Sequence, residues 1–226
     1  YYKDDKAEIM KFKFVWLGQS VLKFEVPLDI FVAINQTYES NFKTLNKANT
    51  QLVGKIENEH TLFYQGEDTP TMKPHNRLPQ NVLNWFESTY KFYLNFNKIS
   101  EYKIRLNSIW VNEMKDNEYN PIHIHQGSLF TGLSSVMILG LPSHYGKEYS
   151  AKDKPTNGSL QILGNANGQF AHVDYAPKLK PRDFYVFPYD VRHSVYPFNS
   201  TNEVRRTLAA NCDVQYNPVN NRGVSD

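Results

Sequence analysis

Two histidines separated by a single residue form the pattern in this sequence that is best suited to chemistry. His123 and His125 lie in the segment Asn-Pro-Ile-His-Ile-His-Gln-Gly-Ser, residues 120–128. In a β-strand, residues two apart point to the same face, with their Cα atoms about 6–7 Å apart. The two imidazoles would then stand side by side, an arrangement that suits one transition-metal ion. An isolated pair of this kind is equally typical of surface histidines at a strand end.

A third histidine and an arginine further along the chain favour the metal-site interpretation. His193 closes the apolar run 184–193, and Arg205 begins a strand-like segment in which Thr207 follows two residues later. The long separation between His125 and His193 leaves room for several strands to return the chain to one cavity. On a strand, Arg205 and Thr207 share a face. A guanidinium beside a hydroxyl is suited to binding a small carboxylate, with the arginine forming two parallel hydrogen bonds.

The elements that must position these residues can be read from hydrophobic spacing. Apolar residues recur at helical intervals behind a proline, which predicts helices over 27–47 and 79–97. Short alternating runs within 12–26 predict strands, whereas the glycines and prolines of 49–77 predict irregular structure. From residue 100 on, short strand-like segments separated by Gly, Pro and Asn turns are typical of a sandwich or barrel. The apolar run 133–139 is predicted to be a central strand.

Composition limits the classes of protein to consider. The chain has 226 residues, 40% of them hydrophobic, and a net charge of +2, so no strong field indicates nucleic acid as a partner. No apolar run approaches the roughly 18 residues of a membrane span. The single cysteine, Cys212, excludes an internal disulfide and a cysteine-based zinc site, and it indicates a reducing, cytoplasmic compartment. We expect one domain over 1–226, with a helical support region at about 1–99 and a catalytic core at about 100–215.

Taken together, these motifs resemble the 2-oxoglutarate- and Fe(II)-dependent oxygenases, specifically the prolyl-hydroxylase-like branch common in bacteria and their viruses. The resemblance covers about residues 100–214 and is carried by His123-x-His125, Gly132-Leu-Ser-Ser-Val-Met-Ile-Leu139, Phe187-Pro-x-x-x-x-His193-x-Val-x-Pro197 and Arg205-x-Thr207 with Asn211. It implies an α+β, mainly β fold: a double-stranded β-helix, or jelly roll, with N-terminal helices packed on one sheet. It also implies a dioxygenase that hydroxylates its substrate and releases succinate and CO2.

The resemblance implies roles for individual residues. His123 and His193 match the first and the distal metal ligand of the family. Arg205 matches the residue that pairs with the far carboxylate of 2-oxoglutarate, and Thr207 matches its hydroxyl partner. Polar residues near the mouth of the cavity are further candidates for positioning cosubstrate or water, and are equally typical of ordinary strands and turns: Asn112, Asn120, Ser134 and Ser135.

The sequence departs from the family pattern at His125, where most members carry Asp or Glu and so present two histidines and one carboxylate to iron. Three arrangements remain open. His125 is the third ligand, a carboxylate such as Asp116, Glu118 or Asp174 completes the site, or only two protein ligands exist. We favour the first, because the period of a strand directs both rings of the pair to one face.

By the same resemblance, the cofactor is Fe(2+), the cosubstrates are 2-oxoglutarate and O2, and ascorbate is an auxiliary reductant. The substrate would be a prolyl or other protein residue, within a peptide or protein, or a small molecule. We expect a bacterial or phage-encoded cytoplasmic protein, monomeric or homodimeric, without nucleic-acid or membrane partners. Two alternatives keep the same fold: a three-histidine cupin-type dioxygenase that does not use 2-oxoglutarate, and a non-catalytic jelly roll that binds a glycan or a protein.

The remaining histidines and Trp110 are assigned less specific roles. His60, His75 and His144 lie in polar or proline-containing stretches and are predicted to be exposed. His172 is a candidate for lining the cavity. Trp110, in the strand-like segment 102–111, is predicted to be part of the core rather than a substrate contact.

Overall fold

The computed structural model describes residues 18–48, 54–149, 155–165, 168–169 and 171–218. Its helices are α1 (Leu28–Asn41), the 3-10 turn η1 (Phe42–Thr44) and α2 (Gln80–Phe96). Its strands are β1 (Leu22–Glu25), β2 (Asn46–Lys47), β3 (Asn58–Tyr64), β4 (His75–Asn76), β5 (Tyr102–Met114), β6 (Asn120–His123), β7 (Gly132–Gly140), β8 (Leu160–Leu163), β9 (Asp174–Tyr175), β10 (Asp183–Pro188), β11 (Arg192–Val195) and β12 (Arg205–Tyr216).

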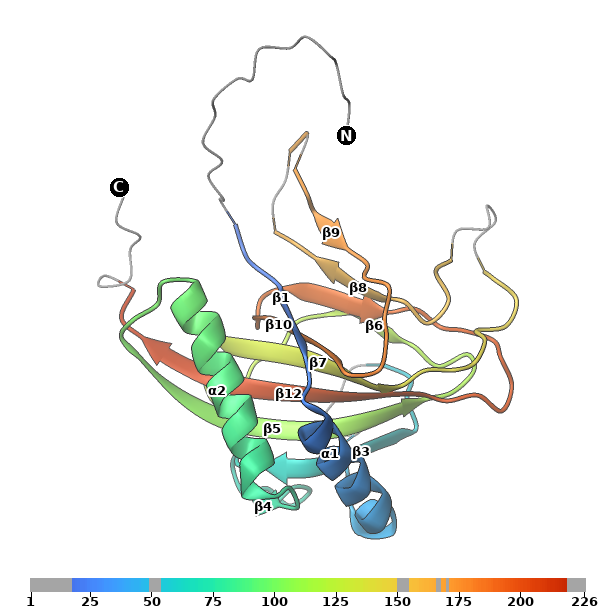
Figure 1. Cartoon of the computed structure of the whole chain (residues 1–226), viewed down its shortest axis with the longest axis horizontal. Coiled ribbons are helices and arrows are strands. Elements are labelled where there is room, and N and C mark those ends of the chain that lie inside the picture. Colours follow the sequence, from blue (N-terminus) through green and yellow to red (C-terminus); the bar gives the residue numbers. More distant parts are fainter. Residues whose placement is uncertain (1–17, 49–53, 150–154, 166–167, 170, 219–226) are drawn as a thin grey trace.

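These strands form two antiparallel sheets. The larger sheet has the order β1-β10-β7-β12-β5-β3-β2, with β4 beside β3, and the smaller has the order β6-β11-β8-β9. Figure 1 shows the smaller sheet lying over one face of the larger one, while both helices lie on the other side. The mainly β jelly roll with N-terminal helices packed on one sheet is therefore confirmed. No helix in the described ranges is long and apolar enough to cross a lipid bilayer.

The main hydrophobic core lies between the helices and the larger sheet. The predicted helix over 79–97 is confirmed as α2, whose apolar stripe buries Val82, Phe86 and Tyr90 completely. On β12, alternate residues belong to this core, namely Leu208, Ala210, Cys212 and Val214. The intervening residues of β12 point to the opposite face, toward the smaller sheet. Because side chains alternate along a strand, one face of β12 packs in the hydrophobic core and the other faces the smaller sheet, where a site can form.

The first helix is shorter than the predicted range 27–47. Helix α1 ends at Asn41, whose side-chain amide donates to the carbonyl of Thr37, and a 3-10 turn follows. The chain then becomes extended, because Asn46 and Lys47 pair with β3 at the edge of the larger sheet. Of the strands predicted within 12–26, residues 12–17 lie outside the described part, and β1 pairs with the distant β10.

The prediction of irregular structure over 49–77 is wrong for the segment that forms β3. This strand is paired on both sides, with β5 on one side and with β2 and β4 on the other. Residues 59–63 are all buried, so the strand lacks the alternation of a half-exposed one. His60 is consequently 5% exposed rather than at the surface, and its ring packs against Phe42.

The strand predicted over 133–139 is confirmed as the central β7, which lies between β10 and β12. Its serines point to opposite faces. Ser135 faces the helices, where its hydroxyl is 2.8 Å from the hydroxyl of Tyr90 and donates to the carbonyl of Ala210. Val136 faces the smaller sheet and lines the cavity between the two sheets. The candidate site lies in that cavity.

Candidate metal centre

His123 and His193 are brought together by strand pairing in the smaller sheet. His123 is the last residue of β6, and His193 lies directly opposite it on the antiparallel β11. Residues opposite each other in such a pair project to the same face. The centroids of the two rings are 4.2 Å apart. Two residues that are far apart in the sequence therefore present their imidazoles to one point.

His125 reaches the same point from a loop, which corrects the expectation that it shares a strand with His123. Strand β6 ends at His123, so His125 is not aimed by the period of a strand. Its backbone N–H instead donates to the carbonyl of Tyr189. Further along this loop, the backbone N–H of Ser128 donates to the buried carboxylate of Asp213.

The Asp213 carboxylate also binds side chains next to this loop. Asp213 also accepts hydrogen bonds from the side chains of Asn107 and Tyr189. Gly127 approaches it so closely that a Cβ atom there would lie within 3.0 Å of the Asp213 carboxylate and the Asn107 amide. The placement of His125 therefore depends on an anchored loop.

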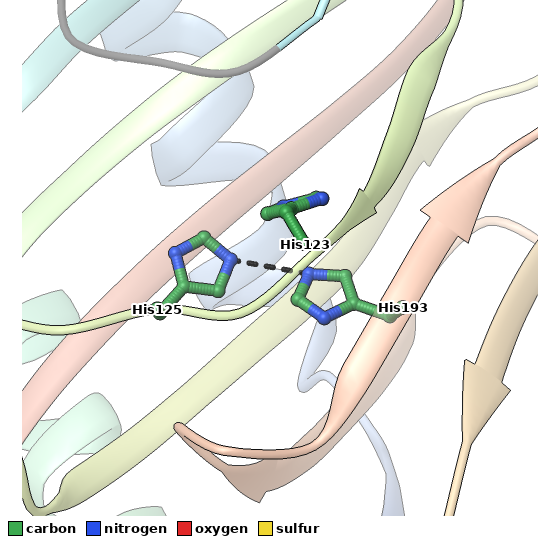
Figure 2. A group of neighbouring side chains, drawn as sticks. All are labelled: His123, His125 and His193. Atoms are coloured by element: carbon green, nitrogen blue, oxygen red, sulfur yellow. Dashed lines mark hydrogen bonds between the residues drawn. The ribbon is translucent and has the colours of Figure 1, made fainter.

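The three histidines form a group whose ligand atoms all lie within 4.8 Å of one another. Figure 2 shows the rings of His125 and His193 facing each other, with His123 beside them. The Nε2 atoms of His125 and His193 are 3.1 Å apart. Two nitrogens at about 2.1 Å from one ion, with an angle of about 90° between them, would be separated by about 3.0 Å. The spacing therefore fits two ligands on one face of a metal ion.

Backbone carbonyl groups orient two of the three rings. Nδ1 of His123 lies 2.7 Å from the carbonyl oxygen of Pro121, and Nδ1 of His193 lies 3.1 Å from that of Val191. A carbonyl can only accept, so each Nδ1 carries the proton and donates. The lone pair of each imidazole is then on Nε2, the atom that faces the other rings. This outer hydrogen bond is the usual means by which proteins orient metal-binding histidines.

Asn211 of β12 lies beside Nδ1 of His125, where the other two histidines have a backbone carbonyl. Its Nδ2 is 3.4 Å from Nδ1 of His125, while its Oδ1 is buried and makes no hydrogen bond within the described part of the chain. The oxygen and nitrogen of an amide are assigned from their hydrogen bonds. With the amide turned over, Oδ1 accepts from Nδ1–H of His125, and the lone pair of His125 is on Nε2. Each ring then has an oxygen partner on its outer side.

Electrostatics favour neutral imidazoles at this position. Burial lowers the pKa of His123, and it lowers the pKa of His193 to about 3. Burial also lowers the pKa of His125 well below its usual value, and the neighbouring rings of His193 and His123 add to this effect. Metal binding requires unprotonated nitrogen. The rings are therefore in the protonation state that a metal ion needs.

The carboxylates considered as third ligands lie elsewhere. Among the described residues, the group capable of holding a metal consists of the three histidines alone. The carboxylate of Glu118 instead accepts hydrogen bonds from the backbone N–H groups of Glu57 and Lys115. Asp174 is exposed on β9. The structure thus brings His125, rather than Asp116, Glu118 or Asp174, beside His123 and His193.

The histidines line a cavity of about 540 Å³ between the two sheets. Thr207, Asn120 and Asn112 line it as well, whereas Ser134 does not, although its buried hydroxyl makes no hydrogen bond among the described residues. Trp110 belongs to a buried cluster, as predicted, but it also lines the cavity, with its ring centroid 5.9 Å from that of His125.

Strand β3 adds lining residues that the sequence reasoning missed. Glu59 and Thr61 lie opposite Asn112 and Trp110 of β5, respectively, and both line the cavity. These two residues line the cavity because β3 pairs with β5, and no local sequence motif predicts that pairing.

Arg205 is the first residue of β12 and is not among the residues that line the cavity. It is 2% exposed, and its Nε donates to the carbonyl of Gly158. Its Nη2 is buried and makes no hydrogen bond to any described residue. Burial lowers the pKa of Arg205 to about 10, which leaves it positively charged at neutral pH, and the nearby Tyr145 counteracts this shift. A buried cation with an unused donor is an incomplete arrangement that an anionic ligand could complete.

The other histidines are separate from this site. His75 is half-buried, and His144 is exposed, with Nδ1 2.9 Å from the hydroxyl of Ser200. His172 is exposed and does not line the cavity, which corrects the role considered for it.

A jelly roll that gathers three neutral imidazoles between its sheets has the architecture of a mononuclear non-haem metal protein. Residues 108–211, just under half of the chain, match the family model described as "Putative 2OG-Fe(II) oxygenase". The resemblance to the 2-oxoglutarate- and Fe(II)-dependent oxygenases is therefore confirmed. No curated protein matches the sequence.

Solved structures show the same fold at low sequence identity. The α-ketoglutarate-dependent non-haem epimerase SnoN from nogalamycin biosynthesis has a TM-score of 0.53 and 12% identity, covering 92% of this chain and 81% of its own. AviO1 from Streptomyces viridochromogenes Tue57 has a TM-score of 0.51 and 12% identity, with coverages of 92% and 94%. A Trichoplax adhaerens prolyl hydroxylase, in complex with a hypoxia-inducible-factor peptide, has a TM-score of 0.51 and 12% identity, with coverages of 92% and 87%.

Proposed function

We propose that the protein is an Fe(II)- and 2-oxoglutarate-dependent dioxygenase that hydroxylates its substrate, with release of succinate and CO2. The observation that supports it most directly is the convergence of the three imidazoles, with Nε2 of His125 3.1 Å from Nε2 of His193, in a jelly-roll cavity. In this proposal His123, His125 and His193 hold the iron. Three ligands on one face would leave the other positions of the ion open. Together with 2-oxoglutarate, bound iron supplies the oxygen-activating chemistry that protein side chains lack.

The chain's own residues would bind and orient the cosubstrate. Arg205 would pair with the far carboxylate of 2-oxoglutarate, because its buried Nη2 has no partner among the described residues. Thr207, two residues along the same face of β12 and lining the cavity, would add a hydroxyl donor. Asn120, which also lines the cavity, and Ser134, whose buried hydroxyl has no partner in the described part of the chain, would assist in positioning the cosubstrate. The two sheets would keep bulk water from the reacting atoms.

The proposed substrate is a prolyl or other residue of a protein or peptide, with O2 as the second cosubstrate and ascorbate maintaining the ferrous state. This class rests on analogy with the prolyl-hydroxylase branch, and the peptide-bound Trichoplax structure shares only the fold. We further propose a cytoplasmic protein, monomeric or homodimeric and encoded by a bacterium or phage. The single cysteine, Cys212, is buried and unpaired, consistent with a reducing compartment.

Succinate formation tests the proposal. Purified protein would be supplied with Fe(II), ascorbate, O2 and 2-oxoglutarate, with and without proline-containing peptides, and succinate would be quantified. We expect Arg205→Ala to lower the affinity for 2-oxoglutarate at least ~30-fold, because losing one partner of a buried charge pair costs about 2–5 kcal/mol. Arg206→Ala is the matched control, since Arg206 pairs with Glu39 and Glu113 outside the cavity. Absence of succinate under every condition would contradict the proposal.

A second candidate function follows from the ligand set itself. Because no carboxylate among the described residues joins the three histidines, the centre also matches a cupin-type dioxygenase that does not use 2-oxoglutarate. In that case, Arg205→Ala would leave turnover nearly unchanged, and oxygen would be consumed without succinate. The third alternative, a non-catalytic jelly roll, predicts that protein purified without chelators contains no stoichiometric metal.

A further inference from the structure

Glu59 is a buried carboxyl group in the cavity wall. It takes no part in the proposed metal centre or in the proposed binding of 2-oxoglutarate. It is 3% exposed, lines the cavity from β3, and its side chain makes no hydrogen bond or ion pair to any described residue. Burial raises the pKa of Glu59 to about 8, and the negative charge of Glu118 adds to this effect. A largely buried acid that faces a cavity would be stabilised by a ligand that donates a hydrogen bond to it.

Strand pairing places Glu59 near the metal centre. Glu59 lies opposite Asn112 on β5, and Asn112 lies opposite Thr207 on β12, so the three side chains form a row across the cavity wall. Trp110 is the diagonal neighbour of Glu59 across β3 and β5. The centroid of its ring is 5.9 Å from that of the His125 ring. Such diagonal neighbours are about 7–8 Å apart. A substrate that extends from the metal over Trp110 would therefore reach Glu59.

The buried polar atoms of this part of the wall that have no partner among the described residues are mainly oxygens, together with one donor, Nε1 of Trp110. The Oδ1 atoms of Asn112 and Asn120 are buried and unpartnered within the described ranges, and both residues line the cavity with Glu59. Glu67 is an exposed residue of the same lining. Among the described lining residues there is no lysine or arginine. The wall thus offers carboxylates and amide oxygens but no cationic partner for them.

The charge of the loaded centre would not change this balance. Three neutral imidazoles leave the two positive charges of a ferrous ion, and the dianion 2-oxoglutarate brings two negative charges. Arg205, which is proposed to hold the far carboxylate of 2-oxoglutarate, adds one positive charge from outside the cavity lining, so Glu59 and Glu67 still have no cationic partner among the described lining residues. An ammonium group has three donors and one positive charge, and a guanidinium has five donors, so either one complements a carboxylate beside amide oxygens.

We propose that the cavity accepts a substrate bearing a cationic nitrogen, as a primary amine or a guanidinium, and that Glu59 is the specificity-determining residue that binds it. This inference rests on the proposed function and narrows its substrate class. It distinguishes a basic substrate from a neutral or acidic one of the same size. Asn112 contributes an acceptor from the adjacent strand.

Three small probes of equal backbone test the inference: the N-acetyl, N′-methylamide derivatives of lysine, norleucine and glutamate. Their binding to the Fe(II)- and 2-oxoglutarate-loaded protein would be measured without oxygen by ligand-detected NMR at pH 8. We expect the lysine probe to bind at least ~10-fold more tightly than the norleucine probe, as for a charge-assisted hydrogen bond. Glu59→Gln should abolish that preference, whereas Glu59→Asp should retain part of it.

Glu67→Gln is the control for a general negative field, because Glu67 is an exposed carboxylate of the same cavity lining. Equal binding of the lysine and norleucine probes, tighter binding of the glutamate probe, or loss of the preference in Glu67→Gln but not in Glu59→Gln would each overturn the inference. Glu59→Gln replaces a buried carboxyl group, which holds its proton below about pH 8, by a neutral amide of the same size, so the variant should fold, which circular dichroism would verify. Separate measurements of iron content and 2-oxoglutarate binding distinguish this failure from failure of the proposed function.

Discussion

Replacing Asn211 by leucine should weaken metal binding without removing a metal ligand. Each of the three histidines has a hydrogen-bond partner at Nδ1. For His123 and His193 the partner is a backbone carbonyl, whereas for His125 it is the side chain of Asn211. His125 also lies beyond the end of β6, so it depends more on such a contact than a strand residue would. Loss of the outer hydrogen bond frees the ring to rotate and to place its proton on Nε2, which would block coordination.

The expected loss is about 10–100-fold in metal affinity, the usual range for removing an outer-shell partner. This corresponds to about 1.4–2.8 kcal/mol. Asn211→Asp should retain most of the affinity, because a carboxylate oxygen still accepts from Nδ1–H of His125. Affinity would be measured by competition with a chromophoric chelator for Co(II) under anaerobic conditions. Ser108→Ala is the matched control, because Ser108 pairs with Asn211 across β5 and β12 and lines the same cavity.

A double-mutant cycle then tests whether the effect acts through His125. In the His125→Ala background, Asn211→Leu should have almost no further effect on metal affinity, giving a coupling free energy close to the whole effect of the single variant. Wild-type affinity in a folded Asn211→Leu variant would refute the assignment of Asn211 as the partner of His125. An equal loss in the presence and absence of His125 would show that Asn211 acts on the cavity in another way.

Three further predictions concern the loop, pH and the core. Gly127→Ala should lower both stability and metal affinity, because its Cβ would contact Asp213, whereas Gly140→Ala meets only an ordinary contact at 3.9 Å and should be tolerated; thermal melts and chelator competition check both. Since the pKa of Glu59 is raised from 4.5 to about 8, the folded protein retains a proton that the unfolded chain releases between these values. The free energy of unfolding should therefore fall as pH rises through this window, by up to about 1.4 kcal/mol per pH unit more than in Glu59→Gln, as urea titrations at pH 5–8 would show. Phe86→Ala should destabilise the protein by about 3–5 kcal/mol, because its fully buried ring packs against Phe184 where α2 covers the larger sheet, and an unchanged urea midpoint would contradict this docking.

Local periodicity in the sequence predicted the elements that repeat regularly over their length. The apolar stripe of α2 and the uninterrupted run of β7 were sufficient to place a covering helix and a central strand. Because side chains alternate along a strand, Thr207 and Asn211 of β12 face the cavity and Leu208 faces the core. Strand β3 gave no such signal, because both of its faces are buried and its neighbours in the sheet come from other parts of the chain.

The sequence by itself determined which donors are available: three imidazoles and a guanidinium, in an order that resembles the oxygenase family. Only the tertiary structure decided how they meet, because His193 reaches His123 through pairing of β11 with β6. It also decided that His125 approaches from a loop anchored near Asp213, rather than from the strand that its spacing predicted. The physical reason is that side-chain periodicity is a local property of the backbone, whereas the walls of a cavity are formed by strand pairs and loop anchors between residues far apart in the chain.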